Sequence, residues 1–106
     1  MKSSDQYDYI VVGSGASGSV LANRLSKNAA NQVLLIETGG SDKNADIQNP
    51  AGFVKLWNTD LDWKIQTEKQ SGLSDRSILI NQGKVLGGST AINAMMYVRG
   101  NPDNFN

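Results

Sequence analysis

Neither cysteine nor histidine occurs among the 106 residues of this sequence. Without cysteine, disulfides and thiolate metal sites are excluded, and the composition suits a reducing compartment. Without histidine, the chain lacks both the commonest metal ligand and the commonest general base. We therefore expect no metal site and no catalytic residue within this chain.

Excess charge and long hydrophobic runs are missing as well. Ten basic residues balance ten acidic ones, and no basic cluster favours a nucleic acid or a membrane surface as the partner. The longest apolar runs, 10–12 and 33–36, are far too short to span a bilayer. Residues 1–6 are polar and lack the apolar core of a signal peptide. These features predict a cytoplasmic protein whose partner has to be inferred from local motifs.

The first 40 residues have the pattern of a strand, a helix and a second strand. Residues 7–12 are β-branched and aromatic, which is typical of a buried parallel strand. Apolar residues recur at helical spacing over 17–27, and 32–37 is a second short apolar run closed by two glycines. The stretch 7–40 therefore predicts a βαβ unit.

Regular patterns weaken after residue 40. The segment 41–82 is rich in loops, and we expect in it a polar loop over 41–50, an aperiodic stretch over 51–63, an extended segment over 65–68 and a strand over 77–81. A glycine-rich segment then precedes a short helix predicted over 91–98. The chain is interpreted as an α/β, Rossmann-like dinucleotide-binding fold that is incomplete, because two parallel strands leave apolar sheet edges that need more chain. No substrate domain is expected within it.

The six residues after the first predicted strand read Gly-Ser-Gly-Ala-Ser-Gly and match the pattern G-x-G-x-x-G. The match follows a strand and opens a helix, as a dinucleotide-binding fingerprint requires. Gly13 allows the tight turn, Gly15 lets the backbone approach a pyrophosphate, and Gly18 permits close packing of helix on strand. Together with Ser14 and Ala16, at the amino end of the helix, these glycines are predicted to bind the cofactor.

An acidic residue, Glu37, ends the second predicted strand 19 residues after Gly18. A dinucleotide site has such a residue at about this distance, where it accepts a hydrogen bond from a ribose hydroxyl. Its charge would repel a 2′-phosphate, so the sequence disfavours NADP. The alternative, a glycine-rich turn and an unrelated surface glutamate, explains less of the pattern. The fingerprint itself does not choose between FAD and NAD.

A second glycine motif, Gly-Lys-Val-Leu-Gly-Gly-Ser-Thr-Ala-Ile-Asn-Ala-Met-Met-Tyr-Val-Arg-Gly, fills residues 83–100. It resembles the first signature of the glucose–methanol–choline (GMC) oxidoreductases, a family of FAD enzymes. Further resemblance takes in nearly the whole chain, over 7–18, 35–42, 49–53 and 62–68. The resemblance implies the amino-terminal part of an FAD-binding domain, in which the second glycine motif runs beneath the pyrophosphate and along the flavin.

The resemblance also implies which residues of the second glycine motif line the cofactor. The matching positions are Val85, Gly88, Ser89, Asn93, Ala94 and Met95. Read directly, paired glycines let the backbone pass close to a planar ligand, hydroxyls can reach a phosphate or a flavin edge, and Asn93 offers both a donor and an acceptor. Met96 and Tyr97 are interpreted as packing residues. Trp57 and Trp63 are interpreted in the same way, because a tryptophan in a loop-rich segment is more often an anchor.

Three departures from the family pattern lie near the expected cofactor. Ile92 matches the position where some members attach FAD covalently through a histidine, so the resemblance implies noncovalent FAD here. Thr38 replaces a common alanine, and Asn81–Gln82 replaces a common proline–arginine pair. The last two changes remove no group that the cofactor obviously needs.

The function implied by the resemblance is oxidation of a small alcohol to an aldehyde or ketone, with hydride transfer to flavin N5. In the family the base is a histidine from the carboxyl-terminal part, so this chain alone is expected to be inactive and to need that part as its partner. Two alternatives remain open, a hydroxynitrile lyase of the same fold, which keeps FAD without using it as an oxidant, and a noncatalytic FAD-binding fragment. The sequence identifies neither the alcohol nor the electron acceptor.

Overall fold

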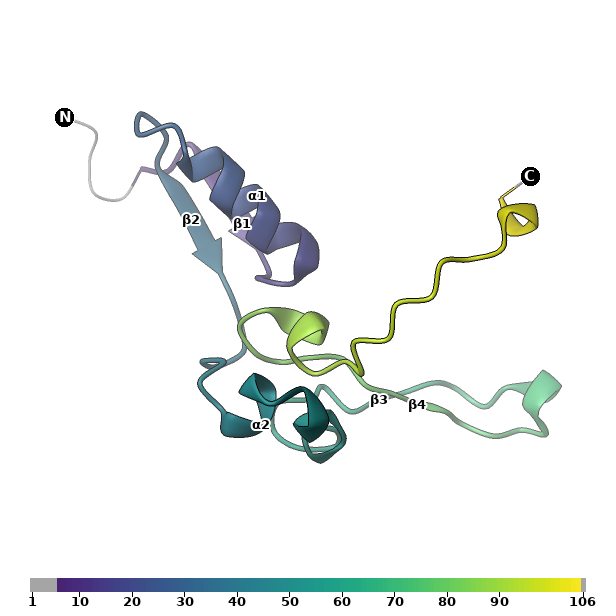
Figure 1. Ribbon diagram of the computed structural model, residues 1–106. Helices are drawn as coiled ribbons and strands as arrows, with labels where there is room; N and C mark the ends of the chain where they lie inside the picture. The colour runs from purple at the N-terminus through teal and green to yellow at the C-terminus, as the bar shows by residue number, and fades with distance from the viewer. Residues whose placement is uncertain (1–5, 106) are drawn as a thin grey trace.

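The βαβ unit forms at the amino-terminal end of the chain (Figure 1). The computed structural model describes residues 6–105, so the polar start predicted over 1–6 lies outside the described residues except for its last member. Strand β1 (Tyr9–Val12) and strand β2 (Val33–Ile36) are parallel, and helix α1 (Ala16–Ser26) connects them. The predicted order of strand, helix and strand is confirmed, with slightly shorter strands.

Close contact between α1 and β1 depends on the last glycine of the fingerprint. A Cβ on Gly18 would lie 1.9 Å from the carbonyl oxygen of Gly13 and 3.4 Å from Cγ1 of Val11. Any side chain there would push the helix off the strand, whereas a hydrogen atom lets Val11 be buried beneath it. The Gly13 amide donates to the carbonyl oxygen of Ile36 at 2.7 Å, which carries the pairing one residue beyond β1.

Two short helices follow β2. Helix α2 (Ala45–Gln48) and the 3-10 helix η1 (Pro50–Lys55) pack against one another. Asn44 and Asn49 begin them, and each asparagine side chain accepts a hydrogen bond from the backbone amide two residues on. The prediction of a loop throughout 41–50 is therefore wrong where α2 forms, because a capped turn was not recognised among its polar residues.

A long antiparallel hairpin leaves this region and projects away from the rest of the molecule (Figure 1). It is formed by β3 (Ile65–Gln66) and β4 (Leu79–Ile80), with the 3-10 helix η2 (Ser71–Leu73) near its tip. The extended segment and the strand predicted in this part of the chain are confirmed. Only two residues of each form regular pairs.

Asp62 holds the base of the hairpin together. It is only 3% exposed, and its carboxylate accepts hydrogen bonds from the backbone amides of Asn58, Lys64 and Gln82 and from the side chain of Asn81. Burial alone would raise the pKa of Asp62, but these hydrogen bonds outweigh burial and lower the pKa to about 2. The charged carboxylate therefore fixes the loop 58–64 to the residues that lead into the second glycine motif.

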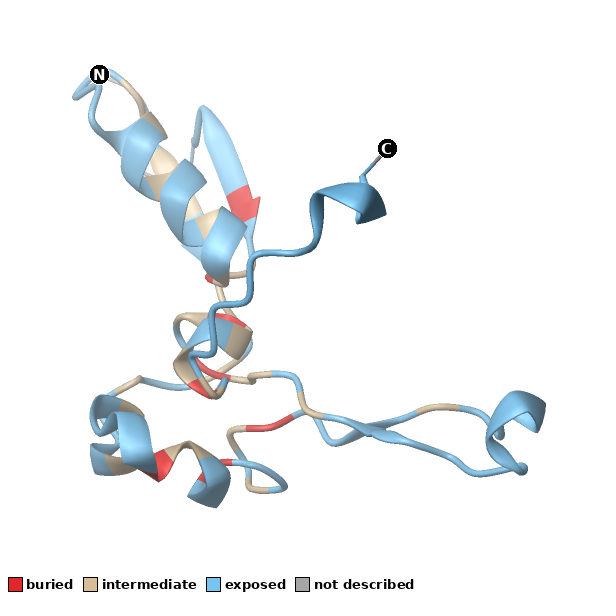
Figure 2. Ribbon diagram, turned by 45° about the vertical axis from the view of Figure 1, so that its right-hand side comes forward, coloured by how far each residue is buried: buried red, intermediate tan, exposed pale blue. Residues whose placement is uncertain are grey.

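A small apolar core lies on the other side of this motif. The core consists of Leu56, Val85 and Ile92, with Ile47, Leu61 and Ala91 packed around them. Leu56 follows η1, whereas Val85 and Ile92 belong to the second glycine motif, so the core joins these two segments (Figure 2). The Trp57 indole donates to the Ile92 carbonyl at 2.9 Å and contacts the ring of Phe53 edge-on at 5.2 Å. Trp57 is confirmed as a packing residue.

The helix predicted over 91–98 does not form. A 3-10 helix, η3 (Gly88–Ala91), takes its place at the start, and the chain then runs on as an extended arm (Figure 1). The Asn93 side chain accepts a hydrogen bond from the Met95 amide at 2.8 Å, and Met95 has φ +52°. Local side-chain bonding of this kind competes with the helix, which explains why the prediction is wrong.

The extended arm carries apolar side chains that contact little else. Met96 and Tyr97 are 83% and 88% exposed, so the prediction that they are packing residues is wrong for this structure. The arm ends in a last 3-10 turn, η4 (Pro102–Asn104). Because no neighbouring element covers these side chains, nothing in this structure stabilises a helix there.

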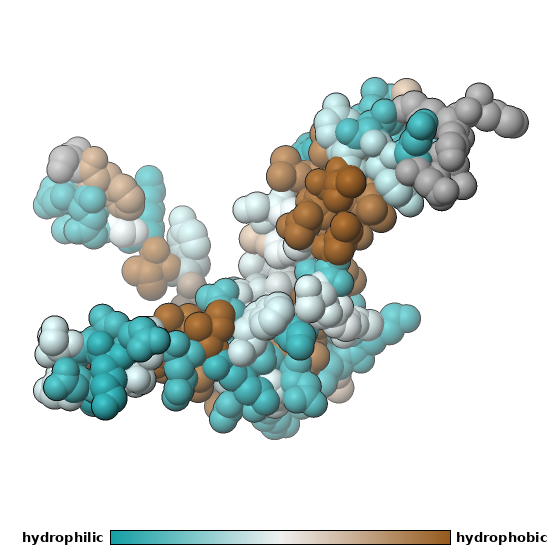
Figure 3. All heavy atoms as spheres, turned by 180° about the vertical axis from the view of Figure 1, so that it is seen from behind, coloured by the Kyte–Doolittle hydropathy of each residue, from teal (hydrophilic) through white to brown (hydrophobic). Residues whose placement is uncertain are grey.

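Apolar side chains also gather on the surface of the βαβ unit (Figure 3). Ile10 and Val12 of β1 are exposed, on the sheet face opposite the buried Val11. Within residues 6–105, every helix falls short of the length and apolar content that a membrane crossing requires.

Candidate functional site

The fingerprint and the second glycine motif meet beyond the carboxyl ends of β1 and β2. A Cβ built on Gly88 would lie 2.9 Å from Cα of Gly15, so backbone passes directly against backbone. Gly88 also has φ +60°, a conformation that is unfavourable for other residues. The contact therefore depends on glycine at position 88.

The chain that follows β2 holds the second glycine motif in place. Gly40 forms a parallel bridge with Val85, and the Leu86 amide donates to the Gly40 carbonyl at 2.8 Å. A Cβ on Gly39 would lie 2.1 Å from the backbone nitrogen of Val85. The motif is thus fixed at the carboxyl ends of the parallel strands, which is where α/β folds bind their ligands.

Glu37 lies just after β2, as predicted, and faces the fingerprint. Its Oε2 accepts hydrogen bonds from the amide and the hydroxyl of Ser14, both at 2.7 Å, and its Oε1 accepts from the Gly39 amide at 2.8 Å. The hydrogen bond from the Ser14 amide, followed by the others, lowers the pKa of Glu37 below its usual value. The carboxylate is therefore ionised at neutral pH. It keeps capacity for a further hydroxyl, since it offers about four lone-pair sites.

A cavity of about 330 Å³, which we call the fingerprint cavity, opens where these parts meet. Its lining residues are Val12, Gly13, Gly15, Ile36, Glu37, Thr38, Trp63, Gln82, Gly83, Gly88 and Ser89. A Cβ on Gly13 or Gly15 would meet no atom within 4 Å, so both positions open into free space. Helix α1 begins here with Gly15 as N-cap and without a side chain capping its first amides. Such amides form an anion site that suits a pyrophosphate.

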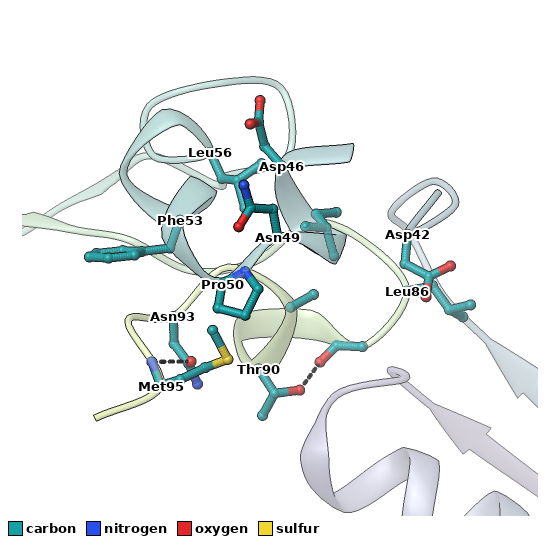
Figure 4. A pocket seen from close by; sticks show the side chains of 13 residues that line it. Asp42, Asp46, Asn49, Pro50, Phe53, Leu56, Leu86, Thr90, Asn93 and Met95 are labelled. Atoms are coloured by element: carbon teal, nitrogen blue, oxygen red, sulfur yellow. Dashed lines mark hydrogen bonds between the residues drawn. The ribbon is translucent and has the colours of Figure 1, made fainter. Parts of the chain in front are cut away.

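A second cavity, of about 240 Å³, lies between the short helices and the second glycine motif, and we call it the loop cavity (Figure 4). Its lining residues are Asp42, Asp46, Ile47, Asn49, Pro50, Phe53, Leu56, Leu86, Gly87, Thr90, Ala91, Asn93 and Met95. Gly87 and Thr90 line this cavity, whereas Gly88 and Ser89 line the other. The second glycine motif therefore contributes to two cavities, which suits a ligand with two separate ends.

The structure brings seven of the twelve predicted cofactor-binding residues to the cavities. Those at the fingerprint cavity are Gly13, Gly15, Glu37, Gly88 and Ser89, and those at the loop cavity are Asn93 and Met95. The residues that line neither cavity are Ser14, Ala16, Gly18, Val85 and Ala94. Val85 is buried in the core, Gly18 packs on β1, and Ser14 is buried behind Glu37. Direct contact of all twelve residues with a cofactor stays a prediction.

Trp63, Thr38 and Gln82 also line the fingerprint cavity, although they were not predicted as site residues. The Lys84 ammonium lies 5.0 Å from the centroid of the half-exposed Trp63 ring, so Trp63 packs against this lysine and also borders the cavity. Gln82 accepts a hydrogen bond from the Ser89 hydroxyl at 2.9 Å. Local spacing gives no signal for this arrangement, because pairing of the Asp62 loop with the residues after β4 creates it.

Acidic side chains do not gather into a metal centre in the described part of the chain. No group of three or more potential ligands that could hold a metal ion occurs among residues 6–105. Glu37 and Asp62 each accept hydrogen bonds from neighbouring backbone instead.

The parallel strands, the glycine turn into α1 and the acidic residue after β2 define a Rossmann-like protein of the dinucleotide-binding class. Comparison with known families then narrows the class, because the family described as GMC oxidoreductase matches residues 7–106. The chain belongs to the GMC oxidoreductase family. The resemblance inferred from the second glycine motif is confirmed.

Three proteins show how close the similarity is. An alcohol dehydrogenase (acceptor) of Pseudomonas putida is 47% identical over 100 residues, which cover 93% of this chain. The crystal structure of pyridoxine 4-oxidase from Mesorbium loti matches 94% of this chain with a TM-score of 0.86 and 41% identity. An FAD-dependent oxidoreductase from Chaetomium thermophilum matches 94% with a TM-score of 0.73 and 33% identity. The chain spans 18%, 20% and 17% of the lengths of these three proteins.

Proposed function

We propose that this chain is the FAD-holding part of an oxidoreductase that acts on CH–OH groups and converts an alcohol to an aldehyde or ketone. The observation that carries the proposal is the contact of Gly15 with Gly88 beside the cavity that Glu37 lines. At this junction, backbone without side chains can approach the pyrophosphate of an extended dinucleotide, and the Glu37 carboxylate can accept a hydrogen bond from its ribose. The similarity to the FAD-dependent oxidoreductase from Chaetomium thermophilum favours a flavin over a nicotinamide cofactor.

The residues present fit FAD. The uncapped amides of α1 would hold the pyrophosphate next to Gly13 and Gly15, and Glu37 would accept a hydrogen bond from the ribose. Asn93 and Met95, which line the loop cavity, would contact the flavin. When bound, FAD supplies the acceptor for the hydride that leaves the alcohol carbon. This chain would bind and orient the cofactor, and it contains no histidine that could take the proton of the alcohol.

The proposal assigns the base and the substrate pocket to a carboxyl-terminal part that these residues do not include. The share of the relatives' length that the chain spans, about a fifth, supports this division. The proposed substrate is a small alcohol, and pyridoxine is a first candidate because a similar structure is named for its oxidation. Nucleic acids and membranes are not among the proposed partners. A cytoplasmic location belongs to the proposal and is tested by cell fractionation with detection of the flavoprotein.

We further propose that FAD is held noncovalently. Ile92 has no nucleophilic group, and its side chain is fully buried between Leu56 and Val85, away from both cavities' open space. Precipitating the flavin-loaded protein with acid should release all of the flavin into the supernatant. Flavin that stays with the precipitated protein would contradict this part of the proposal.

The reaction is tested on the full-length natural protein that contains this chain. Purified protein should show the visible absorption band of oxidised flavin, and an alcohol substrate added without oxygen should bleach that band. A hydroxynitrile lyase of the same fold would keep its oxidised flavin under these conditions and split a cyanohydrin instead. A protein with no flavin after purification and after incubation with FAD would overturn the proposal.

A further inference from the structure

Ser14 occupies a position that none of the functions described so far requires to be serine. It is the first variable residue of the fingerprint, and its side chain is fully buried, with 0% exposure. It lines neither the fingerprint cavity nor the loop cavity. A buried hydroxyl of this kind is costly unless it is hydrogen-bonded.

The hydroxyl of Ser14 lies between the two motifs of the site. It donates to Oε2 of Glu37 at 2.7 Å and accepts a hydrogen bond from the amide of Gly87 at 3.1 Å. The amide of Ser14 donates to the same Oε2, and its carbonyl accepts from the Ser19 hydroxyl at 2.6 Å. Every polar atom of Ser14 is therefore engaged inside the protein.

The bond to Gly87 joins residues that are 73 positions apart in the sequence. Gly87 has φ +95° and begins the turn that places Gly88 against Gly15. A serine hydroxyl can donate and accept at once, so one side chain orients the carboxylate and anchors the turn together. Alanine or glycine could do neither, because both lack the hydroxyl.

We propose that Ser14 is a positioning residue that couples Glu37 to the second glycine motif, so that the sugar-binding carboxylate and the backbone along the flavin are fixed relative to one another. The inference rests on the proposed FAD site. It assigns Ser14 a role through other residues and no direct contact with the cofactor. The hydrogen bond from the Ser14 hydroxyl to Glu37 is charge-assisted and therefore stronger than a neutral one, so it holds the Glu37 carboxylate firmly in place.

The first test compares FAD affinity among variants of the full-length natural protein. Ser14→Ala should raise the dissociation constant of FAD roughly ten-fold, as expected for the loss of a hydrogen bond to a charged group. Ser71→Ala is the matched control, because Ser71 lies in η2 at the hairpin tip with its side chain exposed, and it should leave affinity unchanged. Ser14→Cys should be intermediate, since a thiol is a weaker donor and acceptor. It also serves as the second variant if Ser14→Ala fails to fold.

The second test measures the link between Ser14 and Gly87 by hydrogen exchange, in the absence of any cofactor. In the apoprotein, Ser14→Ala should speed hydrogen exchange at the Gly87 amide about ten-fold or more, because that amide loses its acceptor. The amide of Gly52 donates to the carbonyl oxygen of Asn49, the N-cap of η1, at 2.7 Å. It is the internal reference, and its exchange rate should not change. A double variant of Ser14→Ala with Glu37→Gln should lose less FAD affinity than the product of the two single effects.

The outcomes separate the inference from the proposed function. If the wild-type protein binds no FAD, the proposed function fails. If the wild type binds FAD and Ser14→Ala behaves like Ser71→Ala, the inference is overturned and the function stands. If Ser14→Ala weakens FAD but leaves exchange at Gly87 unchanged, Ser14 acts on Glu37 alone and the coupling is overturned.

Discussion

Gly15 and Gly18 stand three residues apart at the start of α1, yet a side chain at each would have different effects. A Cβ on Gly15 would enter free space at the fingerprint cavity, whereas a Cβ on Gly18 would lie 1.9 Å from the carbonyl oxygen of Gly13. The first glycine keeps the cavity open and the second keeps the helix on the strand. At the scale of single residues, binding and folding can therefore be separated.

We expect Gly15→Val to leave the protein folded and to lower retained flavin at least about ten-fold, because the added side chain would occupy the space of the pyrophosphate. Gly72→Val is the control, since Gly72 also has no atom near its would-be Cβ but lies at the hairpin tip. Flavin content is measured after purification, and folding by circular dichroism. Normal flavin content in Gly15→Val would contradict the placement of the phosphates.

Gly18→Ala, in contrast, should destabilise the fold by about 3 kcal/mol through overpacking.

The low pKa of Asp62 makes a prediction about acid stability. A carboxylate with a pKa of about 2 in the folded state and 3.8 as its ordinary value adds stability above pH 4 and loses it as pH falls toward 2. The contribution at neutral pH is about 2 kcal/mol. We expect Asp62→Asn to lower the thermal midpoint at pH 7 and to flatten the dependence of stability on pH between 4 and 2.

The control for this prediction is Asp60→Asn. Asp60 lies two residues away with a fully exposed side chain, 3.8 Å from the Lys64 ammonium, and surface pairs of this kind contribute little. Thermal melts of both variants across the acid range provide the measurement. Equal effects of the two substitutions would show that the hydrogen bonds to Asp62 are not important for stability.

At the scale of elements, the second glycine motif acts through its turn rather than through a helix. Gly87 and Gly88 both have positive φ, and the 3-10 helix η3 is only four residues long. The turn places Val85 and Ile92 in the core on one side and Gly88 against Gly15 on the other. The second glycine motif therefore contacts both regions and sets the distance between the apolar core and the fingerprint.

Gly88→Ala tests this spacing. The new methyl group would lie 2.9 Å from Cα of Gly15, at a residue with φ +60°, so we expect a loss of about 1–3 kcal/mol in stability together with weaker FAD binding. Gly72→Ala is the matched control and should change neither property. The free energy of unfolding and the FAD dissociation constant are the quantities to compare. Unchanged values for Gly88→Ala would mean that the two motifs do not touch in solution.

The sequence predicted elements well where the pattern was local and badly where partners lay far away. The βαβ unit followed from apolar runs and the G-x-G-x-x-G turn, so β1, α1 and β2 were found. The helix predicted after the second glycine motif was wrong, because the side-chain bond from Asn93 and the lack of a covering element outweigh helix propensity. No pattern in the sequence indicated that Trp63 lines the fingerprint cavity. The hydrogen bond between the Gln82 amide and the Asp62 carboxylate, 20 residues apart, places it beside that cavity.

At the scale of the whole molecule, the chain exposes more surface than a compact domain of its mass. Its accessible area is 8181 Å², whereas a compact protein of 11.4 kDa would expose about 5,800 Å². Its radius of gyration is 17.9 Å, against about 13 Å for a compact chain of this length. Part of the excess is apolar, including Val12, which is 81% exposed.

We therefore expect the isolated 106-residue chain to be poorly stable. In water it should bind the dye ANS, elute as aggregates from a size-exclusion column and melt without a sharp transition, because its exposed sheet face favours association. The same residues within the full-length natural protein should bind little dye. A monomeric isolated chain with a cooperative melt and stoichiometric FAD binding would contradict this expectation and favour a self-sufficient binding module.

The projecting hairpin has a consequence for how the backbone can be divided. Lys69 and Arg76 flank η2 at the tip, and both are exposed, so trypsin should nick the chain there before it cuts elsewhere. The contacts that join the two halves, Asp62 with Gln82, Gly40 with Val85 and Gly15 with Gly88, all lie away from the tip. The nicked halves should stay together, and the tip is accordingly a place where a tag or a split can be introduced without opening the site.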